Sequence, residues 1–387
     1  MTSYTSETLV ARLKKQGALA DPAIEAAFRA VPRHVFLPDI PLRSAYQDES
    51  IPLKHDERGG VTIASTQPSV TARMLSQLEL KPGHNVLQVG AGSGYTAALI
   101  QSVVGANGRV TAIEIDRITA GQAAENLQRV QMGAVNIVEG DGTHGYAPRA
   151  QYDRIIVNGT IWDVPAAWIR QLKPAGILVA PLWLDALQYS AAFRSAANDT
   201  LNSESNKACA FVPLRGSAQG PGMTVRIGGS SLMLTGQVNK LDSAALHLLL
   251  SDTAEIDYLG APLTGRKSKR NFLPYFMLHL PQEFVFCLYD AQGEQQPYGM
   301  NRRGFAALSP GSAVFVSLEG DLTAWVFGGA DAILAVQDTY TAWKAAGMPG
   351  DEQLHIRLVN RESGEAPVPD GVRVYPRMTH DVHAWLD

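Results

Sequence analysis

Several features that mark whole classes of protein are scarce in this sequence. Among its 387 residues only Cys209 and Cys287 are cysteines, too few for a disulfide scaffold or a cysteine metal cluster. No apolar run approaches the roughly 20 residues that span a bilayer, and the first residues lack the apolar core and cleavage site of a secretory signal. These absences predict a cytoplasmic protein with reduced thiols and no membrane partner.

An excess of positive charge is missing as well. Lysine and arginine number 33 against 37 aspartates and glutamates, which gives a net charge of −4. Phosphate backbones are bound by a concentrated basic face, so no nucleic-acid partner is expected. His380 and His383 have helical spacing but no metal-ligand pattern beside them. We interpret them as part of a C-terminal tail and expect no metal centre.

The composition that is present is that of an ordinary globular protein, 45% hydrophobic and 18% charged. The chain is longer than one average domain, which favours two. Small and polar residues gather around 195–222, where a domain boundary is expected. We predict a first domain at residues 1–215 and a second at 216–387.

Short apolar runs alternate with helix-like stretches in the middle of the first domain. Strands are expected at 86–89, 110–115, 135–138, 155–157 and 177–181, with helices at 95–104 and 119–130 between them. This alternation predicts an α/β fold with a doubly wound, mostly parallel sheet, whose ligands bind beyond the carboxyl ends of the strands. In the second domain, β-like runs and a helix at 330–345 predict a smaller α+β unit.

A glycine-rich turn follows the first of these strands. Gly90, Gly92 and Gly94 stand in the run VLQVGAGSGY, which ends at Tyr95. Glycines let the chain turn sharply and let a ligand approach the backbone. Tyr95 takes the place of the third glycine of a dinucleotide fingerprint, and the Gly-Lys-Ser/Thr of a P-loop is absent. The GxGxG spacing resembles the first motif of class I methyltransferases, with a ligand-free turn as the alternative.

Acidic residues stand at the next two strand ends. Glu114, 20 residues after Gly94, can accept hydrogen bonds from both ribose hydroxyls; Asp116 either shares this role or caps the next helix. Asp141 precedes Gly142 after the following strand, and its carboxylate can accept from an adenine amino group, although Asp-Gly turns are common. The three strand ends together predict a site for an adenosine-containing cofactor.

Several separate blocks, in the same order, resemble the protein-L-isoaspartate O-methyltransferase family across roughly residues 6–215. The blocks are 31–38 (VPRHVFLP), 45–48 (AYQD), 67–68 (QP), 140–142 (GDG), 152–156 (YDRII) and 171–174 (QLKP). The resemblance implies a Rossmann-like class I fold, S-adenosylmethionine as cofactor, and methylation of an isoaspartyl or aspartyl carboxylate on a protein or peptide. The ester can then close to a succinimide. Cofactor binding is implied for Gln88, Gly90, Gly92, Gly94, Tyr95, Glu114, Asp141 and Gly142.

The chain departs from the family pattern at two functional positions. Gln88 stands where the family usually has an acidic residue; it can accept one hydrogen bond but offers no charge. The family's active-site serine lies two residues before its proline, so counting back from Pro68 selects Thr66. Counting forward from residues 62–63 reaches Ser65 instead. Either hydroxyl could orient the attacking carboxylate, and a helix N-cap is the alternative role.

Tyr46 and Asp48 fall in the family's substrate loop, which implies substrate contacts; buried structural roles are the alternative. The blocks at 65–69, 162–168 and 211–216 resemble a C-terminally extended subgroup that accompanies bacterial ribosomal-peptide maturation. That resemblance implies recognition of a leader peptide or constrained substrate by the second domain. Two other functions remain open: a catalytically weak binding protein that kept the fold, and a nicotinamide-dependent oxidoreductase.

Overall fold

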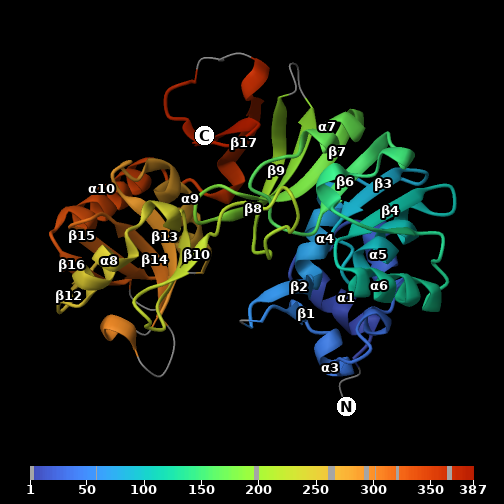
Figure 1. Cartoon of the computed structure of the whole chain (residues 1–387), viewed down its shortest axis with the longest axis horizontal. Helices are drawn as coiled ribbons and strands as arrows, with labels where there is room; N and C mark the ends of the chain where they lie inside the picture. The colour runs from blue at the N-terminus through green and yellow to red at the C-terminus, as the bar shows by residue number, and fades with distance from the viewer. Residues whose placement is uncertain are drawn as a thin grey trace.

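The computed structural model describes residues 4–57, 59–195, 200–259, 266–291, 296–300, 302–319, 322–363 and 368–387. Within these ranges the strands form a ten-stranded sheet, a seven-stranded sheet and a two-stranded hairpin. Figure 1 shows the two large sheets side by side along the long axis of the molecule. No helix of the described ranges is long and apolar enough to cross a bilayer.

Five parallel strands form one half of the ten-stranded sheet, in the spatial order β7-β6-β3-β4-β5. They are β3 (Asn85–Val89), β4 (Arg109–Glu114), β5 (Asn136–Glu139), β6 (Tyr152–Val157) and β7 (Leu172–Trp183). The order reverses at β3, which lies between β4 and β6 and so marks the point where ligands of such sheets bind. This half confirms the predicted doubly wound α/β fold.

The two faces of the parallel strands belong to different cores. On β6, Ile156 packs with the N-terminal helices, whereas Ile155 and Val157 pack on the other face. Both faces are covered, which is why these strands read as continuous apolar runs. The helices of this part are α1 (Ser6–Lys15), α2 (Pro22–Ala30), α3 (Leu42–Ala45), α4 (Pro68–Gln77), α5 (Tyr95–Val104), α6 (Arg117–Arg129) and α7 (Ala166–Gln171).

Antiparallel strands form the other half of the same sheet, in the order β7-β8-β9-β17-β19-β18. They are β8 (Gln188–Ser195), β9 (Leu201–Cys209), β17 (Leu354–Asn360), β18 (Arg373–Pro376) and β19 (His380–Leu386). In Figure 1 the red β17 lies beside β9. The predicted division at 215/216 stays a prediction about folding units, but the last three strands join the sheet of the first part.

The position of β19 corrects our interpretation of two histidines. His380 and His383 lie in a strand rather than in a tail, and both are buried. Residues three apart in a strand point to opposite faces, so the helical spacing of the pair has no structural meaning.

The seven-stranded sheet is antiparallel throughout, in the order β10-β11-β13-β14-β15-β16-β12. Its strands are β10 (Thr224–Arg226), β11 (Met233–Gly236), β12 (Glu255–Tyr258), β13 (Val285–Asp290), β14 (Arg303–Leu308), β15 (Ser312–Ser317) and β16 (Thr323–Gly328). Helices α8 (Ser243–Leu250), α9 (Arg266–His279) and α10 (Asp331–Ala345) accompany them. This is the smaller α+β unit that the sequence predicts.

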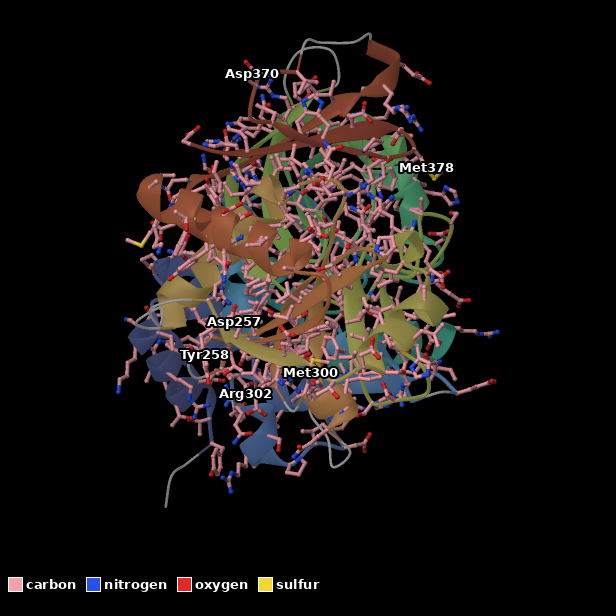
Figure 2. The ribbon with its side chains drawn as sticks, turned by 90° about the vertical axis from the view of Figure 1, so that its left-hand side faces the viewer. Asp257, Tyr258, Met300, Arg302, Asp370 and Met378 are labelled. Atoms are coloured by element: carbon pink, nitrogen blue, oxygen red, sulfur yellow. The ribbon has the colours of Figure 1, made fainter. Side chains whose placement is uncertain are left out.

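The seven-stranded sheet also buries both faces along most of its strands. On β14, Phe305 and Ala307 pack into the core that holds α9 and α10, while Ala306 and Leu308 pack into a separate cluster with α8. The edge strand β12 differs, because all its residues are exposed. Figure 2 labels Asp257 and Tyr258 of this strand at the surface.

Candidate active site

A pocket lies at the carboxyl ends of β3, β4 and β6, where the order of the parallel strands reverses. It is lined by residues 62–66, 88–93, 95–96, 113–115, 142, 158–159 and 212–215. Most of the residues predicted from the sequence are in this lining, namely Ser65, Thr66, Gln88, Gly90, Gly92, Tyr95, Glu114 and Gly142. The lining does not include Gly94, Asp141, Tyr46 or Asp48. Eight of the residues chosen from the sequence therefore surround one cavity.

The glycine loop needs its glycines for two reasons. Gly90, Gly92 and Gly94 have φ of 82°, 54° and 87°, a left-handed conformation that other residues adopt only at a cost. A Cβ on Gly90 would lie 3.2 Å from the carbonyl oxygen of Asn158, and one on Gly94 would lie 3.2 Å from that of Ala123. The loop thus places backbone without side chains at the carboxyl end of β3.

Glu114 ties this loop to the end of β4. Its side chain is only 4% exposed, and it accepts hydrogen bonds from the backbone N–H groups of Gly92 (2.9 Å) and Asp116 (3.1 Å). Each carboxylate oxygen has a further lone pair for a ligand. Nη2 of Arg215 lies 3.8 Å from Oε1. Glu114 is therefore a buried carboxylate in the pocket lining that can accept further hydrogen bonds from a ligand.

Asp116 takes the other role considered for it. Its carboxylate accepts from the backbone N–H and the hydroxyl of Thr119, which caps α6. It also forms an ion pair with Lys54 of β1 (Ile51–His55). The hydrogen bond from Lys54 lowers the pKa of Asp116 to about 2. Asp116 thus holds the β1–β2 hairpin against the site, with β2 (Val61–Ser65) lining the pocket.

Gln88 leaves an acceptor without a partner. Its side chain is 1% exposed, and Nε2 donates to the carbonyl oxygen of Gly90 at 2.9 Å. Oε1 is buried and accepts no hydrogen bond within the described residues. Leaving a buried acceptor unsatisfied costs on the order of 1–3 kcal/mol. A ligand ammonium in the pocket would remove that cost, which is the strongest structural sign that a cofactor amine fits here.

The two candidate hydroxyls lie beside a buried arginine that the sequence did not single out. Arg33 is 0% exposed, and its Nη2 donates to Oγ of Ser65 (3.4 Å) and to the carbonyl oxygen of Thr66 (3.2 Å). Nη1 donates to the carbonyl oxygens of Ala45 and Gln47, each at 3.1 Å. Burial lowers the pKa of Arg33. The signal for it was only its place in the family-like block at 31–38.

Neither hydroxyl caps the following helix. The backbone N–H of Ser69, in the first turn of α4, donates instead to the carboxylate of Asp48 at 2.8 Å, and Nε2 of Gln67 donates to the same carboxylate at 3.1 Å. The capping role considered for Thr66 therefore belongs to Asp48. Ser65 and Thr66 both remain in the pocket lining, and the choice between them stays open.

Tyr46 and Asp48 have structural roles in the loop before β1. Tyr46 is 3% exposed, and its hydroxyl lies 2.7 Å from Nδ1 of His34. Asp48 caps α4, as described above. Their predicted contacts with a substrate stay a prediction, and the structure places both outside the pocket lining.

A segment of residues 211–219, which we call the strap, crosses the carboxyl ends of the parallel strands. At β6, Thr160 donates to the carbonyl oxygen of Val212 (2.9 Å) and accepts from the N–H of Leu214 (2.8 Å). At β4, Arg215 approaches Glu114, and beyond β5 Ser217 reaches Asp141. The strap therefore contacts both acidic residues that the sequence assigns to the cofactor.

Asp141 lies under the far end of the strap. Its carboxylate accepts from the N–H of Thr143 (2.9 Å) and from the N–H and hydroxyl of Ser217 (2.7 and 2.5 Å). Burial raises the pKa of Asp141, but these hydrogen bonds outweigh it and hold that pKa below its usual value. Ser217 occupies this carboxylate in the structure, and the predicted contact of Asp141 with adenine stays a prediction.

The fold and the pocket define a class I methyltransferase. The defining features are a doubly wound sheet, a glycine loop after β3, and an acidic residue at the end of β4. A family model described as protein-L-isoaspartate(D-aspartate) O-methyltransferase matches residues 4–219, more than half of the chain. The chain belongs to this family, and it is an S-adenosylmethionine-dependent methyltransferase.

Two relatives support this assignment, and one solved structure shares the fold. The protein-L-isoaspartate O-methyltransferase of Methanopyrus kandleri is 38% identical over 211 residues, which are 54% of this chain and 91% of that protein. The enzyme of the same name from Methylibium petroleiphilum is 38% identical over 216 residues, 54% of this chain and 76% of its own. A solved protein-L-isoaspartate O-methyltransferase covers 91% of this chain at a TM-score of 0.52 and 24% identity, which shows a shared fold.

Proposed function

We propose that this chain transfers a methyl group from S-adenosylmethionine to the free carboxylate of an isoaspartyl or aspartyl residue in a protein or peptide, which is the α-carboxylate of isoaspartate or the side-chain carboxylate of aspartate. The carrying observation is one cavity that brings the hydroxyls of Ser65 and Thr66 together with the glycine loop and Glu114. The names of the family and of its matched relatives support the isoaspartyl substrate. The proposed product is a methyl ester.

The residues of the pocket fit the cofactor. Glu114 would accept from the ribose hydroxyls, and the orphaned Oε1 of Gln88 would accept from the methionine ammonium. The loop from Gly90 to Gly94 lets the cofactor approach the backbone. The bound cofactor supplies an electrophilic methyl group on a sulfonium. The family-implied contact of Tyr95 is supported by its place in the lining.

Methyl transfer depends more on positioning the acceptor carboxylate and the methyl donor than on acid–base chemistry. A carboxylate is already ionised at neutral pH, so the protein needs no general base to make the nucleophile. The hydroxyl of Thr66 or Ser65 donates to one carboxylate oxygen and leaves the other free to attack. Arg33 supports this by holding the loop at 45–49 and the segment 65–66 in one place. Excluding water from the pocket completes the task.

The ester is then activated toward the peptide backbone. We propose that the amide nitrogen of the next residue attacks the ester carbonyl carbon, which forms a C–N bond and breaks the bond to the methoxy group. The amide proton leaves with the methoxy group as methanol, and a succinimide ring remains. This closure needs no group of the protein.

We propose further that residues 216–387 contact the peptide substrate. The support is the edge strand β12, where Ile256 and Tyr258 are each 54% exposed. An extended peptide can add a strand to such an edge through backbone hydrogen bonds. Leader-peptide recognition would give this function a place in peptide maturation.

The test is incubation of the full chain with labelled S-adenosylmethionine and three peptides of one sequence, containing isoaspartate, aspartate or asparagine. Label in base-labile ester with the isoaspartyl or the aspartyl peptide supports the proposal and identifies the acceptor. Cofactor binding without transfer to any peptide indicates a binding protein that kept the fold. Binding of a nicotinamide cofactor in preference to S-adenosylmethionine contradicts the proposal.

A further inference from the structure

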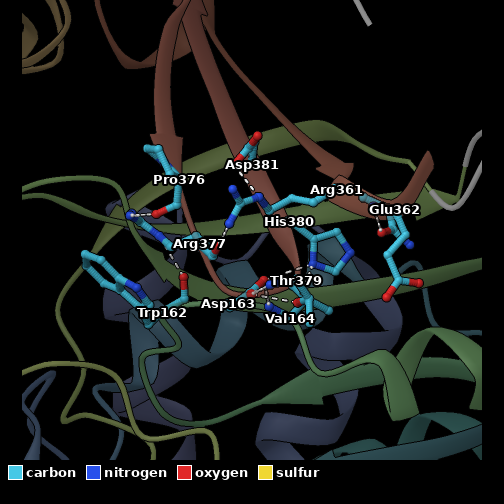
Figure 3. Close-up of polar contacts among 11 residues, drawn as sticks. Trp162, Asp163, Val164, Arg361, Glu362, Pro376, Arg377, Thr379, His380 and Asp381 are labelled. Atoms are coloured by element: carbon cyan, nitrogen blue, oxygen red, sulfur yellow. Dashed lines mark hydrogen bonds and ion pairs between the residues drawn. The ribbon is translucent and has the colours of Figure 1, made fainter. Parts of the chain in front are cut away.

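The turn between β18 and β19 packs against the loop that follows β6. Met378, at the tip of this turn, is 84% exposed, whereas Arg377 and His380 beside it are 5% and 1% exposed. Figure 3 shows Arg377 beside Trp162 and His380 beside Asp163. The turn and the loop are 215 positions apart where they meet.

Arg377 joins two loops with one guanidinium group. Its Nε donates to the carbonyl oxygen of Trp162 at 3.0 Å, and its Nη2 donates to those of Trp183 and Leu184, each at 3.1 Å. The guanidinium carbon lies 3.5 Å from the centroid of the Trp162 ring. The planar fork and the stacking are specific to arginine, because a lysine ammonium offers neither. The loops after β6 and β7 are thus held together from outside the parallel sheet.

Asp163 makes the second attachment. Its Oδ2 accepts from the N–H and the hydroxyl of Thr379, both at 2.6 Å, and its Oδ1 lies 2.9 Å from Nδ1 of His380. The side chains of Asp163 and His380 are 14% and 2% exposed. Figure 3 shows these bonds converging on the one carboxylate.

The attached loop leads directly into the pocket wall. Asn158 and Gly159 line the pocket, and Thr160 carries the two hydrogen bonds to the strap. Ile161 donates to the carbonyl oxygen of Pro181 at 2.8 Å. Each residue from 158 to 161 therefore either lines the pocket or forms a backbone hydrogen bond to a neighbouring segment. We expect a shift of Trp162 to move the pocket lining for this reason.

We propose that Arg377, Asp163 and His380 are positioning residues for methyl transfer: the turn at 376–380 holds the loop at 158–165 and, through it, the strap. The catalytic part of this proposal rests on the proposed function, whereas the structural part does not. The family model ends at residue 219, so that match assigns no role to the turn.

The kinetic test compares Arg377→Lys with two controls, Met378→Ala in the same turn and Arg154→Lys. Arg154 is also buried and donates to the carbonyl oxygens of Leu78 and Glu79, and it pairs with the start of β3, away from the pocket. We expect Arg377→Lys to lower kcat on the accepted peptide about 10- to 100-fold with little change in KM, because small displacements of reacting groups cost rate. Both controls should retain kcat.

A rescue separates positioning from folding at His380. His380→Ala removes the donor to Asp163, whereas His380→Asn keeps a side-chain N–H in a similar place. We expect the asparagine variant to recover most of the kcat that the alanine variant loses. Equal losses in the two variants would count against the Asp163–His380 attachment.

Hydrogen exchange gives a readout that does not depend on activity. Arg377→Lys should speed amide exchange at 158–164 and 211–215, while Arg154→Lys should not. If the unchanged chain methylates no peptide, the proposed function fails and exchange alone decides the structural proposal. Equal exchange in both regions for Arg377→Lys and Arg154→Lys, measured well below their unfolding temperatures, would overturn it.

Discussion

The floor and the wall of the pocket at the ends of the parallel strands are built in different ways. The floor, residues 88–96 and 113–115, is short in sequence and is closed by backbone hydrogen bonds such as those from Gly90 and Ala91 to the carbonyl oxygen of Ile113. The wall consists of residues 158–165 and the strap, which backbone hydrogen bonds of Thr160 join to each other. It is held in addition by side chains from a distant part of the chain, above all Arg377. Both parts lie within residues 4–219, which the family model matches, whereas Arg377 lies beyond them.

The largest expected effect lies on the floor. Glu114→Ala removes the proposed ribose acceptor and the partner of the Gly92 N–H, so we expect S-adenosylmethionine affinity to fall about 100-fold or more, as loss of charge-assisted hydrogen bonds predicts. Calorimetry measures this directly. Glu139→Ala is the control, because that residue ends the neighbouring strand β5 with an exposed side chain. Unchanged affinity in Glu114→Ala would remove Glu114 from the cofactor site.

The next effect separates cofactor binding from turnover. Thr66→Ala should lower kcat about 10- to 100-fold with little change in cofactor affinity, because the role proposed for its hydroxyl is to orient the acceptor carboxylate and not the methyl donor. Thr66→Ser should keep much of the activity. Steady-state kinetics with calorimetry checks both. A fully active Thr66→Ala beside an inactive Ser65→Ala would assign the hydroxyl to Ser65.

A pH effect tests the turn after β7, where Arg377 donates to the carbonyl oxygen of Leu184. Asp185, in the turn after β7, is 6% exposed, and burial raises its pKa to about 6. A carboxyl whose folded pKa is raised stabilises the fold below its unfolded pKa near 4 and loses that contribution as pH rises through 6. Asp185→Asn should therefore be more stable than the unchanged chain at pH 7.5, on the order of 2 kcal/mol.

Chemical unfolding at pH 4 and pH 7.5 checks this prediction. The difference between the two proteins should grow with pH. A constant difference would mean that Asp185 is not the titrating group.

The smallest expected effect concerns the strap. Ser217 donates twice to Asp141, so its hydroxyl competes with any ligand for that carboxylate. Ser217→Ala should raise S-adenosylmethionine affinity about two- to threefold, the size of part of one hydrogen bond. Calorimetry beside Ser230→Ala, whose hydroxyl bonds within its own turn, provides the control. Weaker binding in Ser217→Ala would make the strap part of the cofactor site.

The sequence predicted the floor well, because its information is local. A strand, three glycines with positive φ and an acidic residue at the next strand end form a pattern that short-range sterics impose. The sequence showed that Gln88 departs from the family's usual acidic residue, and the structure shows that its buried Oε1 accepts no hydrogen bond within the described residues. The family blocks and the family match agree on the enzyme class.

The wall was not predictable in the same way. No periodicity links Arg377 to Trp162, because tertiary contacts across 215 positions leave no local pattern. Asp48 was considered for substrate contact, yet its carboxylate caps a helix that begins 20 residues later. Arg33 went unmarked because a buried arginine resembles a surface arginine in the sequence. Side-chain roles of this kind depend on the assembled fold.

The return of β17–β19 to the first sheet also bears on how the chain acquires its structure during synthesis. The parallel strands leave the ribosome early, but β9 obtains its outer neighbour only after all seven strands of the second sheet have been made. Until then β9 presents an open edge, which is a site for wrong strand pairing. Pairings this distant in sequence form slowly. The nascent chain therefore passes through a stage in which its parallel strands are present but their sheet is unfinished.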